Sequence, residues 1–198
     1  MRLGLFGGTF DPPHLGHLIL AAECLHQSDL DGVLWILTPN PPHKQGQTIS
    51  PLENRLAMLQ AALGDDPGFS ISRVEMDRPG PHYAVETVRL LAKHYPNTEL
   101  IYLMGGDSLR DLPTWHEPQQ FIAACDEIGV MHRPDVEINL SELEVTLPGL
   151  LKKVRFVETP LIEISAQDIR HRIRAGLPYR YYLPDSVYQW IRNHDIYR

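Results

Sequence analysis

The chain has 198 residues, a formal net charge of −7 at pH 7, and a composition that is 43% hydrophobic and 22% charged. These proportions are those of a globular protein, which excludes disordered and fibrous classes. The acidic balance, together with Lys/Arg runs no longer than two residues, argues against a nucleic-acid partner.

The cysteine content and the absence of long apolar runs bear on the compartment. Cys24 and Cys125 lie in apolar runs of helical character, which favours a reducing environment over a disulfide framework. The amino-terminal residues reach glycine too early for a signal peptide. No apolar run approaches the roughly 20 residues of a membrane-spanning helix. We therefore predict a cytoplasmic protein with no membrane partner.

Continuous apolar runs, which predict buried strands, alternate along the chain with runs at helical spacing. Ser50 to Glu53 has the pattern of a capping box, so we expect Ser50 to cap a helix that has Pro51 at its first position and runs to about Ala62. Residues 134–149 show no clear period. In chain order the expected elements are strand 3–6, helix 16–27, strand 33–37, helix 51–62, strand 69–72, helix 84–94, strand 100–104, helix 118–124, strands 128–131 and 154–157, and helices 165–175 and 184–194.

This alternation predicts an α/β fold with a Rossmann-like, doubly wound parallel sheet. We expect one domain over residues 1–198, with a carboxy-terminal helical part, about 165–198, packed on it. In such sheets ligands bind beyond the carboxyl ends of the strands, so residues that follow strands are the candidates for function.

The segment from Gly7 to His17 follows the first expected strand and leads into a helix. Its paired glycines permit a tight turn and close approach to a ligand, and a helix amino terminus favours phosphate. His14 and His17 lie three positions apart on the first turn, where their rings can donate to phosphoryl oxygens. The alternatives are a metal pair or a coincidence. Zinc needs further ligands that the sequence does not place nearby, so no metal site is predicted.

Gly7 to His17 matches the G-G-T-F-D-P-x-H-x-G-H signature of adenylyltransferases in the nucleotidyltransferase superfamily, which the chain resembles. Residues 164–170 resemble the second signature of that superfamily, I-S-S-T-x-I-R. Ala166 and Gln167 replace its hydroxyl pair, so the Gln167 amide or main-chain N–H groups are the alternatives for one phosphate contact. The resemblance implies that Ser165 caps the helix and that Arg170 contacts phosphate.

Four further segments, 41–44, 80–87, 105–109 and 112–116, resemble the bacterial nicotinate mononucleotide adenylyltransferases. That resemblance implies transfer of an adenylyl group from ATP to nicotinate mononucleotide, with Mg²⁺ bound to the phosphates and no covalent protein intermediate. The alternatives are a related adenylyltransferase acting on nicotinamide mononucleotide or phosphopantetheine, and a non-catalytic nucleotide sensor. A homo-oligomer is left open.

The candidate site residues divide by the substrate that each is expected to contact. Trp115 is expected to stack on the pyridine ring, the alternative being a core position under a loop. Lys44 is expected to reach a phosphate as a point charge, the alternative being a solvated lysine. The candidates are His14, His17, Lys44 and Arg170 for catalysis; Gly8, Thr9, Phe10, His14, His17, Gly106, Asp107, Arg133, Ser165 and Arg170 for ATP; and Asn40, Lys44, Tyr83, Thr87 and Trp115 for the mononucleotide.

Overall fold

The computed structural model describes residues 1–42, 46, 48–131, 138–160 and 163–198. Its centre is a six-stranded sheet in which every neighbouring pair is parallel, in the order β3-β2-β1-β4-β5-β6. This order confirms the predicted doubly wound sheet. The strands are β1 (Arg2–Gly8), β2 (Gly32–Leu37), β3 (Phe69–Ser72), β4 (Glu99–Gly105), β5 (Glu127–Met131) and β6 (Val154–Val157).

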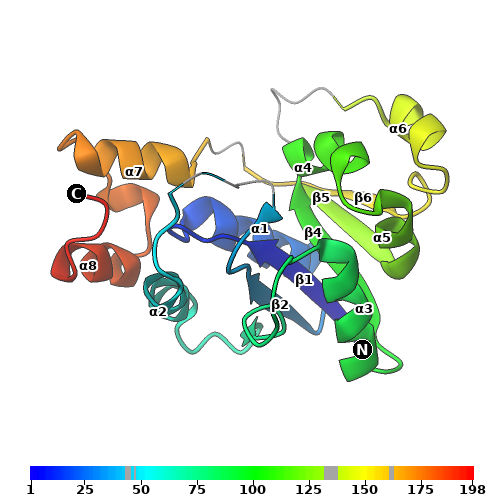
Figure 1. Cartoon of the computed structure of the whole chain (residues 1–198), viewed down its shortest axis with the longest axis horizontal. Helices are drawn as coiled ribbons and strands as arrows, with labels where there is room; N and C mark the ends of the chain where they lie inside the picture. Colours follow the sequence, from blue (N-terminus) through cyan, green and yellow to red (C-terminus); the bar gives the residue numbers. More distant parts are fainter. Residues whose placement is uncertain (43–45, 47, 132–137, 161–162) are drawn as a thin grey trace.

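Helices cover both faces of the sheet (Figure 1). They are α1 (Leu15–Gln27), α2 (Leu52–Leu63), α3 (Ala84–His94), α4 (Gly106–Asp111), α5 (Pro118–Ala124), α6 (Leu140–Thr146), α7 (Ala166–Arg174) and α8 (Asp185–Asn193), with short 3-10 turns at Leu112–Thr114 and Arg180–Tyr182.

The strands are apolar on both sides because each face of the sheet is buried. In β1, Leu5 packs in the cluster that includes the α3 residue Val88, whereas Phe6 packs in the cluster that includes the α1 residue Leu20. Successive strand side chains point to opposite faces, so one short run supplies two cores. This explains why the sequence reads as unbroken hydrophobic segments rather than alternating ones.

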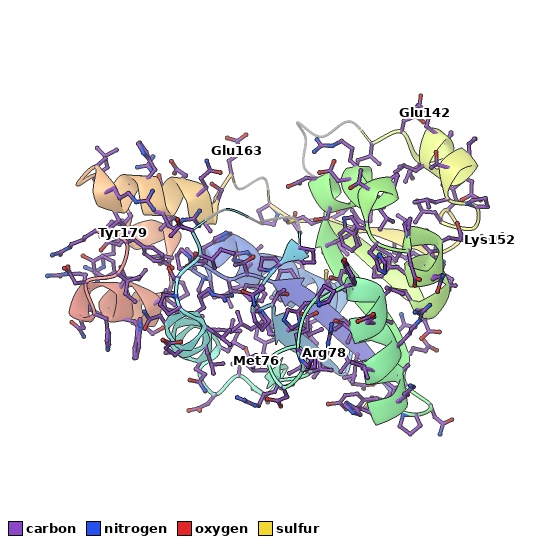
Figure 2. All side chains as sticks on the ribbon, in the orientation of Figure 1. Met76, Arg78, Glu142, Lys152, Glu163 and Tyr179 are labelled. Atoms are coloured by element: carbon purple, nitrogen blue, oxygen red, sulfur yellow. The ribbon has the colours of Figure 1, made fainter. Side chains whose placement is uncertain are left out.

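The carboxy-terminal helices form a third core with α2. Met58 on α2 packs with Ile169 of α7 and with Val187 and Ile191 of α8. Figure 1 shows α7 and α8 at the end of the molecule beside α2, and Figure 2 shows the Tyr179 side chain at that same end.

The point where the strand order reverses lies between β1 and β4. The chain proceeds from β1 outward to β2 and β3, then returns to place β4 on the other side of β1. The loop that follows β1 and the helix α4 that follows β4 therefore leave from neighbouring strand ends, which is where doubly wound sheets bind ligands. The Gly7–His17 segment runs from the last residues of β1 into the first turn of α1, and Gly106 and Asp107 follow β4.

The capping-box prediction at Ser50 was wrong. The helix begins at Leu52, Pro51 occupies the cap position, and no side chain caps it. The Ser50 backbone is instead held by other partners: its N–H donates to Asp11 Oδ2 and its carbonyl accepts from Arg55 Nε. These tertiary bonds replace the local cap.

Two short helices, α4 and α6, were not predicted, because each is only a turn or two long. The predicted cap at Ser165 is confirmed: its hydroxyl accepts from the Asp168 N–H at 3.0 Å.

Candidate functional site

The loop after β1 folds back on the core before it reaches α1. Phe10 has a left-handed backbone, with φ of 46°, and its ring packs between Phe6 and Trp35. A Cβ at Gly8 would lie 2.8 Å from that ring, so only glycine fits there. Phe10 is almost fully buried, so its side chain belongs to the core, and a contact with ATP would come from its main chain.

The two motif histidines stack on each other. The ring centroids of His14 and His17 are 3.6 Å apart, with an interplanar angle of 27°. The His14 N–H donates to Nδ1 of His17 at 3.2 Å, which leaves the proton of a neutral His17 ring on Nε2. A Cβ at Gly16 would come within 3.2 Å of the His14 ring, so the glycine between the histidines allows this packing. His17 is therefore set up to donate from Nε2.

Arg55 is a buried guanidinium that joins three segments of the site. It is 2% exposed, and it donates from Nη1 to the carbonyls of Thr9 and Thr38, at 3.0 and 2.8 Å. Nη2 donates to the Pro39 carbonyl at 2.8 Å, and Nε donates to that of Ser50 at 2.9 Å. Burial lowers the pKa of Arg55, although the Asp11 carboxylate opposes this. The loops after β1 and β2 are thus held by one side chain.

The two sequence motifs meet in the structure. Nη1 of Arg170, on α7, donates to the main-chain carbonyl of Asp11 at 2.6 Å, across 159 positions of sequence. Ser165 is the amino-terminal cap of the same helix, and it is exposed. Arg170 therefore lies against the loop that carries His14.

Two of the predicted mononucleotide residues, Tyr83 and Trp115, pack against other aromatic rings. Tyr83, the residue before α3, stacks on His116 with centroids 3.9 Å apart. Trp115 is half-buried and packs against Phe121, at 5.2 Å, and edge-on to Tyr102, at 6.1 Å. Both readings of Trp115 therefore have support, since part of its surface is in the core and part is open.

Thr87 is placed differently from the other acceptor candidates. It is 1% exposed, and its hydroxyl donates to Glu75 Oε1 at 2.5 Å while accepting from Arg78 Nη2 at 3.2 Å. Burial raises the pKa of the Glu75 carboxyl, although bonds from Thr87 and Thr38 oppose this. The Thr87 hydroxyl is therefore bonded to Glu75 and Arg78 inside the protein, in the first turn of α3.

The remaining candidates are distributed as follows. Gly106 begins α4 directly after β4, and Asp107 follows it, half-buried. Asn40 is exposed in the loop after β2. Lys44 and Arg133 lie outside the described residues.

Neither cysteine is suited to nucleophilic catalysis. Burial raises the pKa of the Cys24 thiol to about 12, and it does the same for Cys125. Thiolates are the reactive form, so both side chains act as small apolar groups. Within the described ranges, no group of three or more His, Cys, Asp or Glu side chains is arranged to hold a metal ion. Over the same ranges, no helix is long and apolar enough to span a bilayer.

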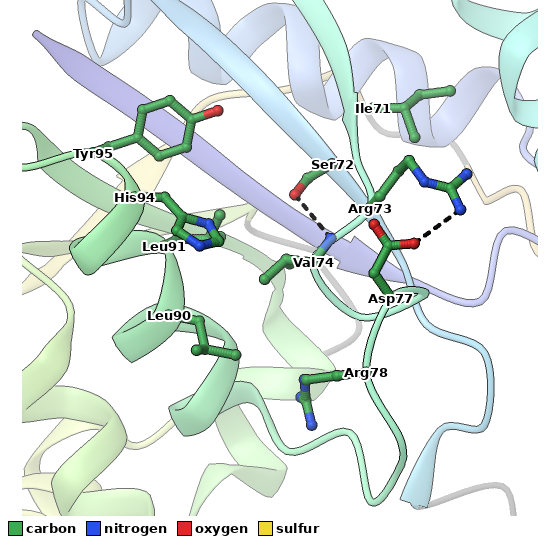
Figure 3. Close-up of a pocket in the computed structure, with 10 residues that line it drawn as sticks. All are labelled: Ile71, Ser72, Arg73, Val74, Asp77, Arg78, Leu90, Leu91, His94 and Tyr95. Atoms are coloured by element: carbon green, nitrogen blue, oxygen red, sulfur yellow. Dashed lines mark hydrogen bonds and ion pairs between the residues drawn. The ribbon is translucent and has the colours of Figure 1, made fainter.

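A groove of about 420 Å³ lies between α3 and the segment that follows β3 (Figure 3). Leu90 and Leu91 line it from α3, and Arg73 and Asp77 form an ion pair on the opposite side. Among the candidate site residues that the structure describes, none lines this groove. Arg78, which lines it, lies beside α3 in Figure 2.

Sequence reasoning did not select Arg55, Glu75 or Tyr197. Arg55 carried a signal, since it falls on the same helical stripe as the buried Met58, Leu59 and Leu63. A cation inside an apolar stripe is buried with partners. Glu75 and Tyr197 had no comparable pattern around them.

Comparison with known proteins finds matches over the full length. The cytidylyltransferase-like family model matches residues 5–172. A Thermomicrobium roseum protein curated as "Probable nicotinate-nucleotide adenylyltransferase" is 47% identical over 197 residues, covering 100% of this chain and 92% of its own length. A Symbiobacterium thermophilum protein of the same name is 40% identical over 201 residues, covering 99% and 95%.

Solved structures of Plasmodium falciparum nicotinic acid mononucleotide adenylyltransferase share the fold. The form complexed with NaAD superposes with a TM-score of 0.82 at 14% identity, over 99% of this chain and 97% of that one. The form complexed with APC gives a TM-score of 0.79 at 14% identity, over 99% and 96%. At this identity the likeness concerns the arrangement of helices and strands.

Proposed function

Because the chain belongs to the nicotinate-nucleotide adenylyltransferase family, we propose that it joins ATP and nicotinate mononucleotide to give nicotinic acid adenine dinucleotide and pyrophosphate. The family resemblance read from the two sequence motifs is confirmed by these relatives. The observation that carries the proposal in this chain is the bond from Arg170 to the Asp11 carbonyl, since it brings both motifs to one edge of the sheet.

The reaction needs positioning more than it needs a reactive side chain. A phosphate oxygen of the mononucleotide attacks the α-phosphorus of ATP, the new P–O bond forms, and the bond to the β-phosphate oxygen breaks to release pyrophosphate. Both substrates are anions, so fixed donors and cations lower the barrier. The buried cysteines take no part in this step.

His17 is the donor best prepared for the α-phosphate. Its Nδ1 is occupied by the His14 N–H, so Nε2 carries the proton that can be donated. His14 stacks on that ring and limits its orientation. We propose that His17 stabilises charge on the α-phosphoryl group and that Arg170 and Lys44 neutralise the flanking phosphates.

The nucleotide subsites follow from the strand order. We assign the adenosine to the first turn of α4, at Gly106 and Asp107, and the triphosphate to the loop after β1 and to Ser165 and Arg133. We assign the pyridine ring to Tyr83 and Trp115. We assign Asn40 to the same substrate, since it follows Pro39, whose carbonyl Arg55 binds.

Magnesium is expected to enter with ATP. The donor set of the described residues offers no cage of three or more ligands. Mg²⁺ commonly keeps several waters and binds substrate phosphates with little protein contribution. We therefore propose a metal held mainly by phosphate oxygens, which neutralises charge on the triphosphate.

The test is pyrophosphate release from ATP with a panel of acceptors: nicotinate mononucleotide, nicotinamide mononucleotide and phosphopantetheine. We expect the highest kcat/KM with nicotinate mononucleotide. A higher value with either other acceptor would reassign the substrate. Tight ATP binding with no turnover on any acceptor would support a nucleotide sensor instead. A His17→Ala variant, assayed in parallel, controls for contaminating activity.

A further inference from the structure

The loop that carries the motif histidines is tied to the far end of the chain. The hydroxyl of Tyr197, the second-to-last residue, donates to Asp11 Oδ1 at 2.6 Å, across 186 positions of sequence. Burial and the adjacent Asp11 carboxylate raise the pKa of Tyr197, which keeps the phenol a donor. A short O–H bond to a carboxylate is a strong one.

Asp11 is the point at which several segments converge. It is 4% exposed, its other carboxylate oxygen accepts from the Ser50 N–H at 3.2 Å, and its carbonyl accepts from Arg170. The residue lies between Thr9, whose carbonyl Arg55 binds, and His14. Fixing Asp11 therefore fixes the middle of the loop that leads to the histidine pair.

The chain takes an unfavourable path to deliver the phenol. After α8, Asp195 and Tyr197 both adopt left-handed backbones, with φ of 53° and 72°. Non-glycine residues hold such conformations only where surrounding contacts determine them. Ile196 between them is buried in the core with Met58, and the Tyr197 hydroxyl lies 3.8 Å from Met58 Sδ. The reversal thus anchors one residue in the core and directs the next at Asp11.

We propose that Tyr197 is a positioning residue for adenylyl transfer, which acts through Asp11 to hold the loop that presents His14 and His17 to the phosphates. This inference rests on the proposed function. It assigns a role in turnover to a residue outside both sequence motifs. Removing the phenol hydroxyl leaves the ring and its packing in place, so loss of activity without loss of fold is the expected signature.

The experiment compares full-length wild-type protein with Tyr197→Phe. We expect kcat to fall by about tenfold or more, since a small misplacement at a reacting centre has effects of that order, with only a small change in Tm. Tyr181→Phe is the matched control, because Tyr181 is 84% exposed. Turnover of Tyr197→Phe within twofold of wild type would overturn the proposal.

Two further variants separate positioning from stability. Ile196→Val weakens the same packing without touching the hydroxyl, so we expect it to lower Tm and leave kcat near wild type. An equal loss of kcat in Ile196→Val would overturn the proposal. In an Asp11→Ala background, Tyr197→Phe should cost much less than it does alone, because the carboxylate that accepts from the phenol is already absent. Fully multiplicative losses would also overturn it.

The two proposals fail in different ways. If wild-type protein releases no pyrophosphate with any acceptor, the proposed function fails. If wild-type protein turns over and Tyr197→Phe does so equally well, only the role of Tyr197 fails.

Discussion

The imidazole ring of His14 lies face to face with that of His17, with their centroids 3.6 Å apart. The His14 N–H also donates to Nδ1 of His17. The two residues are therefore a unit: one sets the tautomer and orientation of the other. Their spacing in the sequence indicated one helical face, but the structure adds that a main-chain bond prepares Nε2 of His17 as the donor.

Replacing His17 by Ala is expected to lower kcat by about two orders of magnitude, the effect typical of removing a transition-state donor. His26→Ala is the matched control, because His26 is exposed on the last turn of the same helix. Steady-state pyrophosphate release measures both. Near-normal turnover of His17→Ala would remove it from the catalytic residues.

Replacing Trp115 by Ala is expected to raise the KM for the mononucleotide and to leave the KM for ATP little changed. The structure adds a second effect, since the ring packs on Tyr102 and Phe121. We expect a stability loss of about 2 kcal/mol or more from the lost aromatic packing. Kinetics and urea unfolding together measure the two effects. A raised KM for ATP alone would mean that the two pockets are exchanged.

Replacing Arg55 by Leu is expected to destabilise the protein by about 2–4 kcal/mol, because it leaves buried carbonyls without donors. Those carbonyls belong to the loops after β1 and β2, so kcat should fall as well. Arg73→Ala is the control: Arg73 is 61% exposed and forms a surface ion pair with Asp77, so a change within about 0.5 kcal/mol is expected. Equal losses of stability in the two variants would contradict the role of Arg55.

Glu75 predicts a pH dependence of stability. Burial raises the pKa of its carboxyl above the ordinary 4.5. In the pH window between the unfolded-state pKa and the higher folded-state pKa, the folded state keeps a proton that the unfolded state has lost. This group therefore makes the folded state less stable as the pH rises through that window, by up to about 1.4 kcal/mol per pH unit. Glu75→Gln removes the titration, so its stability relative to wild type should increase with pH.

Urea unfolding from about pH 4 to pH 8 measures this difference. Glu163→Gln makes the same replacement at an exposed position and serves as the control. A difference between Glu75→Gln and wild type that stays flat with pH would show that Glu75 titrates alike in both states.

Much of the architecture followed from local pattern. Runs such as 33–37 and 100–104 are apolar at every position, and this is what a strand buried on both faces requires. The cap at Ser165 was readable because capping involves residues within one turn. The cap at Ser50 was misread for the converse reason: its N–H bonds the Asp11 carboxylate, 39 positions away in the sequence, and this tertiary bond outweighed the local pattern.

By itself, the sequence determined the fold class, through its periodicity, and the family and motif residues, through the resemblance of its short motifs to known signatures. Only the tertiary structure decided how the motifs are held. Arg55 joins loops from two strands, and Arg170 and Tyr197 reach Asp11 from the other end of the chain. Such contacts join residues far apart in sequence and leave no periodic trace. Within a chain of net charge −7, Arg55 and Arg170 bind main-chain carbonyls at the edge of the sheet where the phosphates are proposed to bind.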